Sequence, residues 1–135
     1  MNMTTYTKTE FKKFAVKAAR AADAKKAENI KLLDTTQAWP LADFVLIATV
    51  DSAAQMEAVD YGIGKELKKI ALFKIHRDGT DSRLWRVLDY GGFIVHILMP
   101  ETREFYGLDR LYHLAKPVRW EAAVIKKPAR PAKKR

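Results

Sequence analysis

The segment Asp43–Val50 constrains the fold more than any other part of this chain. It contains five consecutive apolar residues, from Phe44 to Ala48, without a polar residue between them. A strand with one face in water alternates apolar and polar residues, whereas a strand covered on both faces does not need to. The sequence therefore predicts a central strand over 43–50 with other elements packed on both of its faces.

The remaining patterns predict two long helices and four more strands. Thr7 and Glu10 have the spacing of a capping box, and the apolar stripe that follows at helical spacing predicts a helix over about 7–26. A second helix is predicted from Ser52 to about Ile70. The predicted strands lie at 30–33, 72–75, 84–88 and 93–98, and two short helical elements are predicted at 100–107 and 108–114.

Glycine and proline punctuate these elements. Gly62 and Gly64 fall inside the second predicted helix, where each costs about 1 kcal/mol relative to alanine, so we expect close packing or a kink there. The tight loop of a hairpin is predicted at 89–92, which reads Asp-Tyr-Gly-Gly. Trp39-Pro40 predicts an extended break before the central strand.

Length and composition place the chain among small globular proteins. A chain of 135 residues is long enough for a single domain. Its longest apolar run is far shorter than the roughly 20 residues of a membrane helix. Cysteine is absent, which excludes thiol chemistry and fits a reducing compartment, so we expect a cytoplasmic protein. We place the domain at 1–115 and a basic, proline-containing tail at 116–135, disordered from about residue 126.

The positive charge is unevenly distributed. The formal net charge is +9, but Lys126–Arg135 holds six basic groups and no acid, which leaves +3 for the rest of the chain. The basic character therefore belongs mainly to the tail, and we expect no basic binding face on the folded body.

Patterns for metal or cofactor chemistry are missing from the sequence. His76, His96 and His113 are 20 and 17 residues apart and belong to no zinc motif. We therefore expect neither a metal site nor a cofactor. No two acidic residues stand two apart along a strand, as a two-metal nucleotidyltransferase would require. Carboxylates that converge from separate segments keep this enzyme class open as an alternative.

The strand predicted near 84–89 carries the most informative side chains. Trp85, Val87 and Asp89 share one face because side chains alternate along a strand. A tryptophan beside a carboxylate suits a surface that binds a basic partner. A core position for Trp85 and a loop-capping role for Asp89 remain open.

The other candidate residues have structural interpretations of their own. His96, on the predicted strand 93–98, is expected to be a hydrogen-bonded core histidine, with a partner contact as the alternative. For Arg103 and Tyr106 we expect packing and an exposed salt bridge.

Four separated blocks resemble the ribosomal silencing factor family, RsfS, whose members are also called Iojap-like proteins. They lie at 29–34, at 42–49 with Ser52, at 85–96 and at 103–111, within a resemblance that covers about 7–114. The resemblance implies a single α/β domain with a mixed sheet of about five strands and flanking helices. Its shape would be related to nucleotidyltransferases, without known catalysis.

The resemblance also implies a function. Family members are expected to bind the fourteenth protein of the large ribosomal subunit, to block joining of the two subunits, and so to repress translation without being enzymes. It is compatible with a homodimer. The alternative is a nucleotidyltransferase-like enzyme or a nucleotide-binding protein.

The family motifs fall on particular residues of this chain. The W-x-x-x-D strand falls on Trp85 and Asp89, which we expect to contact the ribosomal protein directly, while the other residues mainly support that surface. The complete predicted partner-binding set is Trp85, Asp89, Tyr90, His96, Arg103 and Tyr106.

The chain departs from the family pattern at Val50, Gly92 and Tyr112, which bears on affinity more than on fold. The basic tail lies outside the resemblance. We expect its cations to contact ribosomal RNA, with a purely solubilising tail as the alternative. These cations are Lys126, Lys127, Arg130, Lys133, Lys134 and Arg135.

Overall fold

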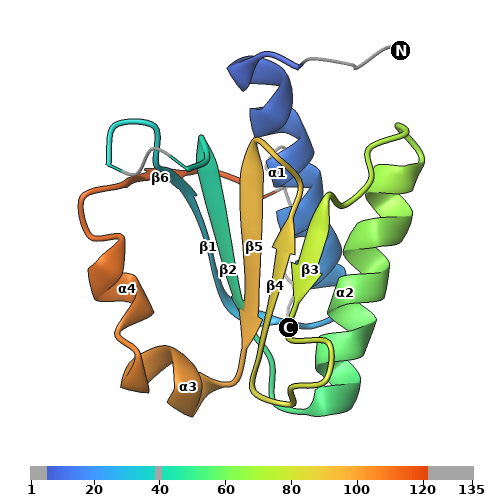
Figure 1. Cartoon of the computed structure of the whole chain (residues 1–135), viewed down its shortest axis with the longest axis vertical. Coiled ribbons are helices and arrows are strands. Elements are labelled where there is room, and N and C mark those ends of the chain that lie inside the picture. The colour runs from blue at the N-terminus through green and yellow to red at the C-terminus, as the bar shows by residue number, and fades with distance from the viewer. Residues whose placement is uncertain (1–5, 39–40, 122–135) are drawn as a thin grey trace, which may run out of the picture.

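The computed structural model describes residues 6–38 and 41–121, which form one α/β domain (Figure 1). This confirms the α/β class and the mixed sheet with flanking helices, although the sheet has six strands. In chain order the elements are α1 (Lys8–Ala24), β1 (Glu28–Asp34), β2 (Phe44–Thr49), α2 (Ala53–Lys68), β3 (His76–Asp78), β4 (Trp85–Asp89), β5 (Phe93–Leu98), α3 (Pro100–Phe105), α4 (Leu108–Leu111) and β6 (Lys116–Val118).

The sheet is built around β2. Its strand order is β3-β4-β5-β2-β1-β6. β2 runs parallel to β5, whereas β1 lies antiparallel to β2 and β6, and β4 lies antiparallel to β3 and β5. All six residues of β2 are buried. The prediction of a central strand covered on both faces is therefore confirmed.

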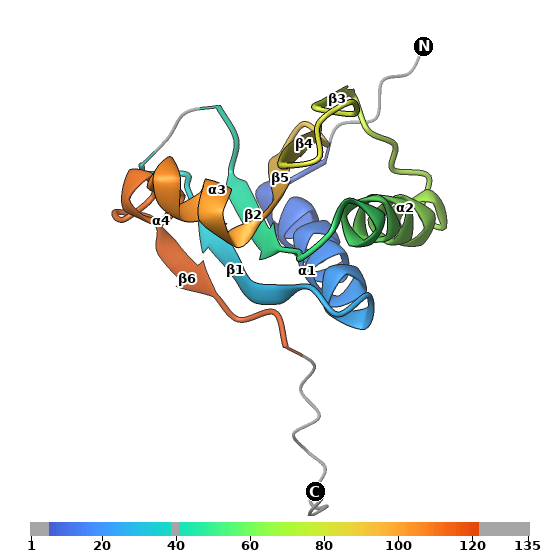
Figure 2. The same cartoon turned by 90° about the horizontal axis from the view of Figure 1, so that it is seen from below.

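Helices α1 and α2 lie side by side over one face of the sheet (Figure 2). The predicted capping box is present, because the Glu10 amide donates to Thr7 Oγ1 at 3.1 Å and the Thr7 amide donates to Glu10 Oε1 at 2.9 Å. Ser52 caps α2 by accepting a hydrogen bond from the Gln55 amide at 3.0 Å. The main core lies between this helical layer and the sheet.

Close packing at the middle of α2 explains one of its glycines. A Cβ atom at Gly62 would lie 3.2 Å from Cε of Lys25, which follows α1. That separation is tighter than most Cβ contacts in proteins. Glycine at this position therefore lets the Lys25 side chain lie across α2.

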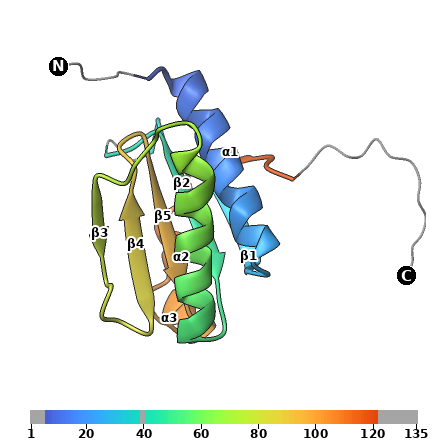
Figure 3. The same cartoon turned by 90° about the vertical axis from the view of Figure 1, so that its right-hand side faces the viewer.

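The opposite face of the sheet has a smaller cover, made by α3 and α4. Pro100 stands in the first turn of α3, as predicted. Gly107 adopts a left-handed conformation, with φ of 60°, and joins α3 to α4. A second buried cluster forms beneath these helices from Leu33, Val45, Ile47, Leu98, Leu108 and Tyr112. Seen from the side of α2, the helical layer stands in front of the sheet and α3 behind it (Figure 3).

The strand predicted at 72–75 is wrong, because the edge strand β3 begins at His76. After α2 the chain turns through Ala71, which has a φ of 60°. Leu72 then enters the main core, and its amide donates to the Leu67 carbonyl at 3.0 Å. Pairing with β4 starts where the Ile75 amide donates to the Asp89 carbonyl at 2.7 Å. Leu72 thus fills the core instead of joining a ladder, whereas Phe73 and Ile75 are exposed.

The folded body extends past the domain boundary at residue 115 that the sequence predicts. Strand β6 pairs with β1, with Val118 opposite Leu32. The Trp120 carbonyl then accepts a hydrogen bond from Arg20 Nε at 2.9 Å. A strand of three residues that contains proline gives almost no signal of its own, and it exists because β1 offers it an edge. The predicted break at Trp39-Pro40 and the tail from residue 126 lie outside the described residues.

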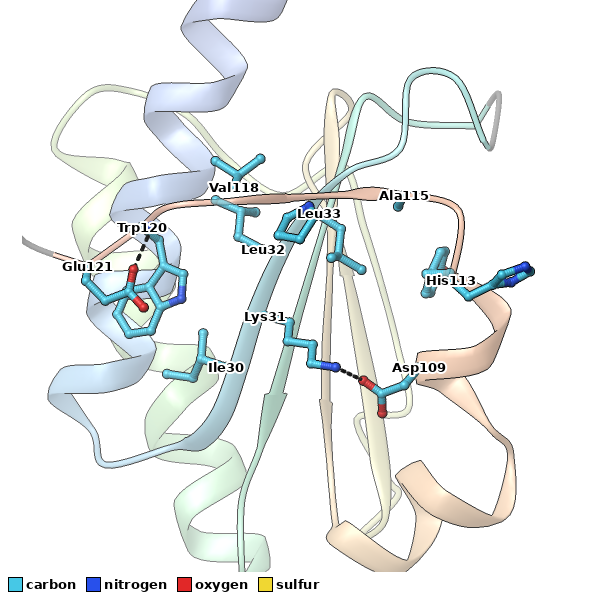
Figure 4. Close-up of a pocket in the computed structure, with 12 residues that line it drawn as sticks. Ile30, Lys31, Leu32, Leu33, Asp109, His113, Ala115, Val118, Trp120 and Glu121 are labelled. Atoms are coloured by element: carbon cyan, nitrogen blue, oxygen red, sulfur yellow. Dashed lines mark hydrogen bonds and ion pairs between the residues drawn. The ribbon is translucent and has the colours of Figure 1, made fainter.

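A hollow of ≈ 350 Å³ opens between β1, α4 and the segment that contains β6 (Figure 4). Within it, Lys31 Nζ lies 2.9 Å from Asp109 Oδ1, so β1 is joined to α4 by an ion pair. Separately, none of the helices in the described ranges is long and apolar enough to cross a membrane.

Candidate docking surface

Trp85 lies at the start of β4, on the sheet face opposite the helical layer. It is half-buried, and its Nε1 donates a hydrogen bond to His96 Nδ1 at 3.1 Å. The exposed ring of Tyr106, directly after α3, lies against it with a centroid distance of 5.0 Å. The structure therefore brings together three of the predicted residues: Trp85, His96 and Tyr106. The indole is held in place on one side and covered by an accessible aromatic ring on the other.

His96 is a buried, neutral histidine that orients Trp85. The indole can only donate, so His96 Nδ1 must accept, and the ring proton resides on Nε2. Nε2 then donates to Tyr112 Oη, 3.2 Å away on the α4 side. Burial lowers the pKa of His96 from 6.5 to about 4, which keeps this arrangement neutral at physiological pH. The prediction of a hydrogen-bonded core histidine is confirmed.

Asp89 shares the face of Trp85 but not its immediate neighbourhood. Asp89 lies four positions further along β4, about 13 Å away at the usual rise of a strand, with Val87 between the two on the same face. Asp89 Oδ1 accepts a hydrogen bond from the Gly91 amide at 2.8 Å. Gly91 has a φ of 92° in the hairpin loop. Asp89 thus caps the loop, the second of the two roles that the sequence leaves open, and remains half-buried at the rim.

Tyr90 lies on the other side of the sheet. It is 2% exposed and belongs to the main core, where its ring stacks on Phe93 at a centroid distance of 5.0 Å. Burial, together with the nearby negative charge of Asp60, raises the pKa of its hydroxyl. The structure therefore does not bring Tyr90 to the surface that carries Trp85.

Arg103 lies on α3, and its side chain is buried between this helix and the sheet. The expectation of an exposed salt bridge is therefore wrong. Its Nε and second terminal nitrogen donate to the two carboxylate oxygens of Asp109 at 2.9 and 3.0 Å. Its remaining nitrogen donates to the Asn29 carbonyl and to Thr49 Oγ1. The Arg103 guanidinium holds the pKa of Asp109 well below its usual range. Arg103 fastens α3 and α4 to β1 and β2.

An apolar rim around Trp85 was missed from the sequence. Phe105 is 81% exposed and Tyr106 60% exposed, and their rings meet edge to face at 4.9 Å. Leu84, the residue before Trp85 in the sequence, is also exposed, as are Leu111 at the end of α4 and Leu114 after it. Two adjacent aromatics at the end of a short helix were an available signal, because neighbouring helical side chains do not point to one face.

Two exposed acids accompany the apolar rim. Glu101 and Glu104 both lie on α3. Together with Asp89 at the far end of β4, they give this side of the sheet carboxylates beside its aromatic rings. An exposed apolar patch edged by polar groups is typical of a surface that binds another protein.

On the helical side, Arg86 forms a buried network that the sequence did not predict. One of its terminal nitrogens donates to Asp60 Oδ2 and to Glu57 Oε1, both at 2.9 Å. Burial alone would lower the pKa of Arg86, but the hydrogen bonds to Glu57 and Asp60 raise it above its ordinary value. The two carboxylates of α2 that converge are thus bound to an arginine. Across 6–38 and 41–121, no group of three or more metal-ligating side chains comes together.

Comparison with known proteins identifies the family. The model of the family "Ribosomal silencing factor during starvation", RsfS, matches residues 8–135. This chain belongs to the RsfS family. RsfS proteins are non-enzymatic ribosome-binding factors of translation regulation, and membership implies binding of the large ribosomal subunit.

Curated RsfS relatives come from bacteria and plants. The chain is 32% identical over 105 residues to the chloroplastic protein Iojap of Zea mays, covering 78% of this chain but only 46% of the maize protein. It is 32% identical over 111 residues to the RsfS of Halalkalibacterium halodurans, covering 79% of this chain and 92% of that one. The RsfS of Chromobacterium violaceum is 28% identical, with 80% and 88% covered.

Solved structures confirm the fold of the RsfS family in this chain. A crystal structure from Chromobacterium violaceum matches with a TM-score of 0.72 at 27% identity, covering 83% of this chain and 93% of the other. A crystal structure from Bacillus halodurans matches with a TM-score of 0.69 at 25% identity, covering 80% and 98%.

Proposed function

We propose that this protein represses translation by binding the fourteenth protein of the large ribosomal subunit through the surface around Trp85. We call Trp85, Asp89, Phe105 and Tyr106 the docking surface. The observation that carries the proposal is the accessible aromatic pair of Phe105 and Tyr106 on a tryptophan that His96 holds in place. His96 and Arg103 are buried and support this surface, whereas Tyr90 lies in the core on the other side of the sheet.

The docking surface has the composition of an interface centre. Aromatic residues dominate the binding energy of many interfaces when they enter a desolvated pocket. Covering Phe105 and the exposed part of Tyr106 would contribute about 2 kcal/mol each. The Tyr106 ring already lies against Trp85, so less entropy is lost when it is covered than for a mobile side chain.

The charges around the docking surface select a basic partner. Glu101 and Glu104 are exposed on α3, and Asp89 lies at the far end of β4. Carboxylates around an apolar centre accelerate encounter with a cationic surface and disfavour acidic partners. A basic ribosomal protein therefore fits this surface.

The arrangement of the layers supports a steric mechanism of repression. Helix α3, which carries Phe105, and the α1–α2 layer lie on opposite sides of the sheet (Figure 2). When the docking surface is bound, the sheet and the helical layer project away from the ribosomal protein. The domain then occupies the space through which the small subunit approaches. Occlusion of this kind requires binding and no turnover.

The test compares exposed residues that can be changed without removing core contacts. Phe105→Ala combined with Tyr106→Ala should weaken binding to the purified fourteenth protein and to large subunits by more than tenfold. Ile75→Ala is the matched control, because Ile75 is 70% exposed at the β3 edge. Asp89→Asn removes the negative charge of this residue, while its side-chain oxygen can still accept the hydrogen bond from the Gly91 amide.

Cosedimentation with large subunits, and inhibition of subunit joining in a sucrose gradient, provide the two readouts. The proposal predicts that both fall together for the aromatic variant and that Ile75→Ala leaves both unchanged. Equal binding by the aromatic variant and by Ile75→Ala, with both proteins folded, would rule out this surface.

Three further features belong to the proposal. The six cations from Lys126 to Arg135 are expected to add contacts to ribosomal RNA, so a chain that ends at Ile125 should bind large subunits with a weaker dependence on salt. An unchanged salt dependence favours a solubilising tail.

We place the protein in the cytoplasm, supported by the absence of cysteine. A homodimer remains a prediction that analytical ultracentrifugation tests.

A further inference from the structure

The outer surface of the helical layer is basic, although the sequence predicts no basic face on the body. A groove of ≈ 390 Å³ runs between α1 and α2. Its basic lining consists of Lys17, Arg20, Lys25, Lys65 and Lys69. Glu66 is the acid in this lining. The Glu66 carboxylate lies 2.9 Å from Lys69 Nζ. This hydrogen bond, together with the charges of Lys69, Lys17 and Lys65, lowers the pKa of Glu66.

A second groove, of ≈ 530 Å³, lies on the other flank of α2, next to the approach to β3. Lys65, Lys68, Lys74 and Arg77 line it. Its buried acid, Asp60, is already surrounded by cations, at 2.9 Å from Arg86, 3.1 Å from Arg77 and 3.4 Å from Lys74. Glu57 also lines this groove and is paired with Arg86, so the four cations of the lining outnumber its two acids.

Tyr61 and Lys65 line both grooves, so the two grooves meet along α2. Tyr61 is 67% exposed at this junction. Among the described residues, Lys17, Lys65 and Lys68 form no ion pair. Two shallow basic grooves that converge on an accessible aromatic ring have room for a chain of negative charges and for a flat ring stacked on Tyr61.

We propose that the α1–α2 face binds the phosphate backbone of RNA, with Lys17, Lys65 and Lys68 as phosphate contacts and Tyr61 as a stacking platform for a base. Lysines spread along a groove neutralise successive phosphates and release their counterions. An exposed aromatic ring stacks on any base, which adds affinity without sequence preference. An acidic protein would offer the charge but no reason for Tyr61.

This second interaction surface lies on the opposite side of the sheet from Trp85 and does not depend on the docking surface. The carboxylates Glu101 and Glu104 lie on the docking side, whereas the lysines of α2 lie on the helical side (Figure 3). A chain that is docked through Phe105 and Tyr106 would still present the basic grooves. The protein could then hold an RNA segment on the side that faces away from its ribosomal partner.

The test uses the full chain and a fluorescein-labelled single-stranded RNA of twelve nucleotides, followed by fluorescence anisotropy across a salt series. Lys65→Glu combined with Lys68→Glu should weaken binding by about tenfold or more at 0.1 M salt. It should also reduce the slope of log K against log salt by roughly 0.7 for each lost phosphate contact. Tyr61→Ala should weaken binding by about fivefold, whereas Tyr61→Phe should retain it.

The matched control is Lys116→Glu combined with Arg119→Glu. These two cations are also exposed, lie near β6 at the other edge of the sheet, and change the net charge by the same amount. Both double variants keep the basic tail, so any contribution of the tail cancels. Lys65→Gln with Lys68→Gln repeats the test if charge reversal unfolds the protein.

The proposal is supported if the α2 variants lose RNA affinity and the β6 variants do not. Equal losses in the two sets, no measurable binding by the native chain, or displacement of the RNA by polyglutamate of equal charge would each overturn it; the last result would identify an acidic protein as the partner. The Phe105→Ala and Tyr106→Ala variant should bind RNA normally, which separates this proposal from the docking proposal.

Discussion

The two sides of the sheet each contain one buried arginine, and the two arginines are paired differently. On the helical side, Arg86 binds Asp60, whose side chain is 3% exposed, and Asp60 is shared with Arg77 and Lys74. On the docking side, Arg103 binds Asp109, whose side chain is 41% exposed. Both arginines fasten helices to strands. Asp60 is sealed from water, whereas part of the Asp109 carboxylate stays in contact with solvent.

The largest expected difference comes from removing each carboxylate in turn. Asp60→Ala leaves a buried arginine without its closest counter-charge and should lower the free energy of unfolding by about 3–5 kcal/mol. Asp109→Ala should cost less, about 1.5–3 kcal/mol, because the buried Arg103 loses two hydrogen bonds to a charged partner but keeps those to Asn29 and Thr49. Urea denaturation of both variants measures the difference. Equal decreases in the free energy of unfolding for the two variants would contradict the difference proposed between the two arginine pairs.

Acid should act on the docking side through His96. Its pKa is about 4 in the folded chain and 6.5 in the unfolded chain, so the unfolded state binds more protons between these values. The free energy of unfolding therefore has its full value above pH 6.5. It decreases as the pH falls and is about 2 kcal/mol lower at pH 5. Denaturation at pH 7, 6 and 5 measures this decrease. His96→Gln cannot titrate, so the pH dependence over this interval should disappear in that variant even if it is less stable at pH 7.

Because α1 packs closely on the hairpin, a side chain added at position 92 should lower the free energy of unfolding by about 1–3 kcal/mol. A Cβ atom at Gly92 would overlap the ring of Phe11. Gly92→Asp, which adds a side chain at this position, should therefore destabilise this protein by that amount in urea denaturation. Phe11→Ala removes the obstacle, so the double variant should lose less than the sum of the single variants. Strict additivity would show that the ring does not conflict with a side chain at position 92.

The smallest expected effects concern the exposed aromatic ring on each side. Tyr61→Ala should change the free energy of unfolding by less than about 0.5 kcal/mol, because Tyr61 is 67% exposed. Tyr106→Ala should cost up to about 1 kcal/mol, since it removes a ring contact with Trp85. Thermal melts of the two variants provide the measurement. A larger loss for Tyr61→Ala would show that the helical side depends on its surface aromatic.

Local sequence patterns predicted the parts of the fold that rest on local rules. The capping box at Thr7 and Glu10, the buried strand β2 and the β4–β5 hairpin all formed as expected. The alternation of side chains along β4 also held, because Arg86 and Leu88 are buried while Trp85 and Asp89 are half-buried on the opposite face. Capping and alternation act within a few residues of chain, so a sequence displays them directly.

The misplaced elements depend on partners that lie far away in the sequence. β6 is a strand because the outer edge of β1 lacks another neighbour there, and Leu72 is a core residue because α2 ends above the sheet. Arg103 contacts residues 54 and 74 positions away, which explains why its burial could not be read from its own segment. The same is true of Asp60 and Arg86, which are 26 residues apart.

By itself, the sequence determined the class of fold, the central strand and the face on which Trp85 lies, because hydrophobic period and capping are local properties. The family blocks indicated what such a chain does. Only the tertiary structure decided which candidates are accessible: it buried Tyr90 and Arg103, exposed Phe105, and placed the lysines of α1 beside those of α2. Whether a charged side chain can bind a partner depends on which other side chains lie near it in space. Packing between segments that are distant in the sequence decides which ones those are.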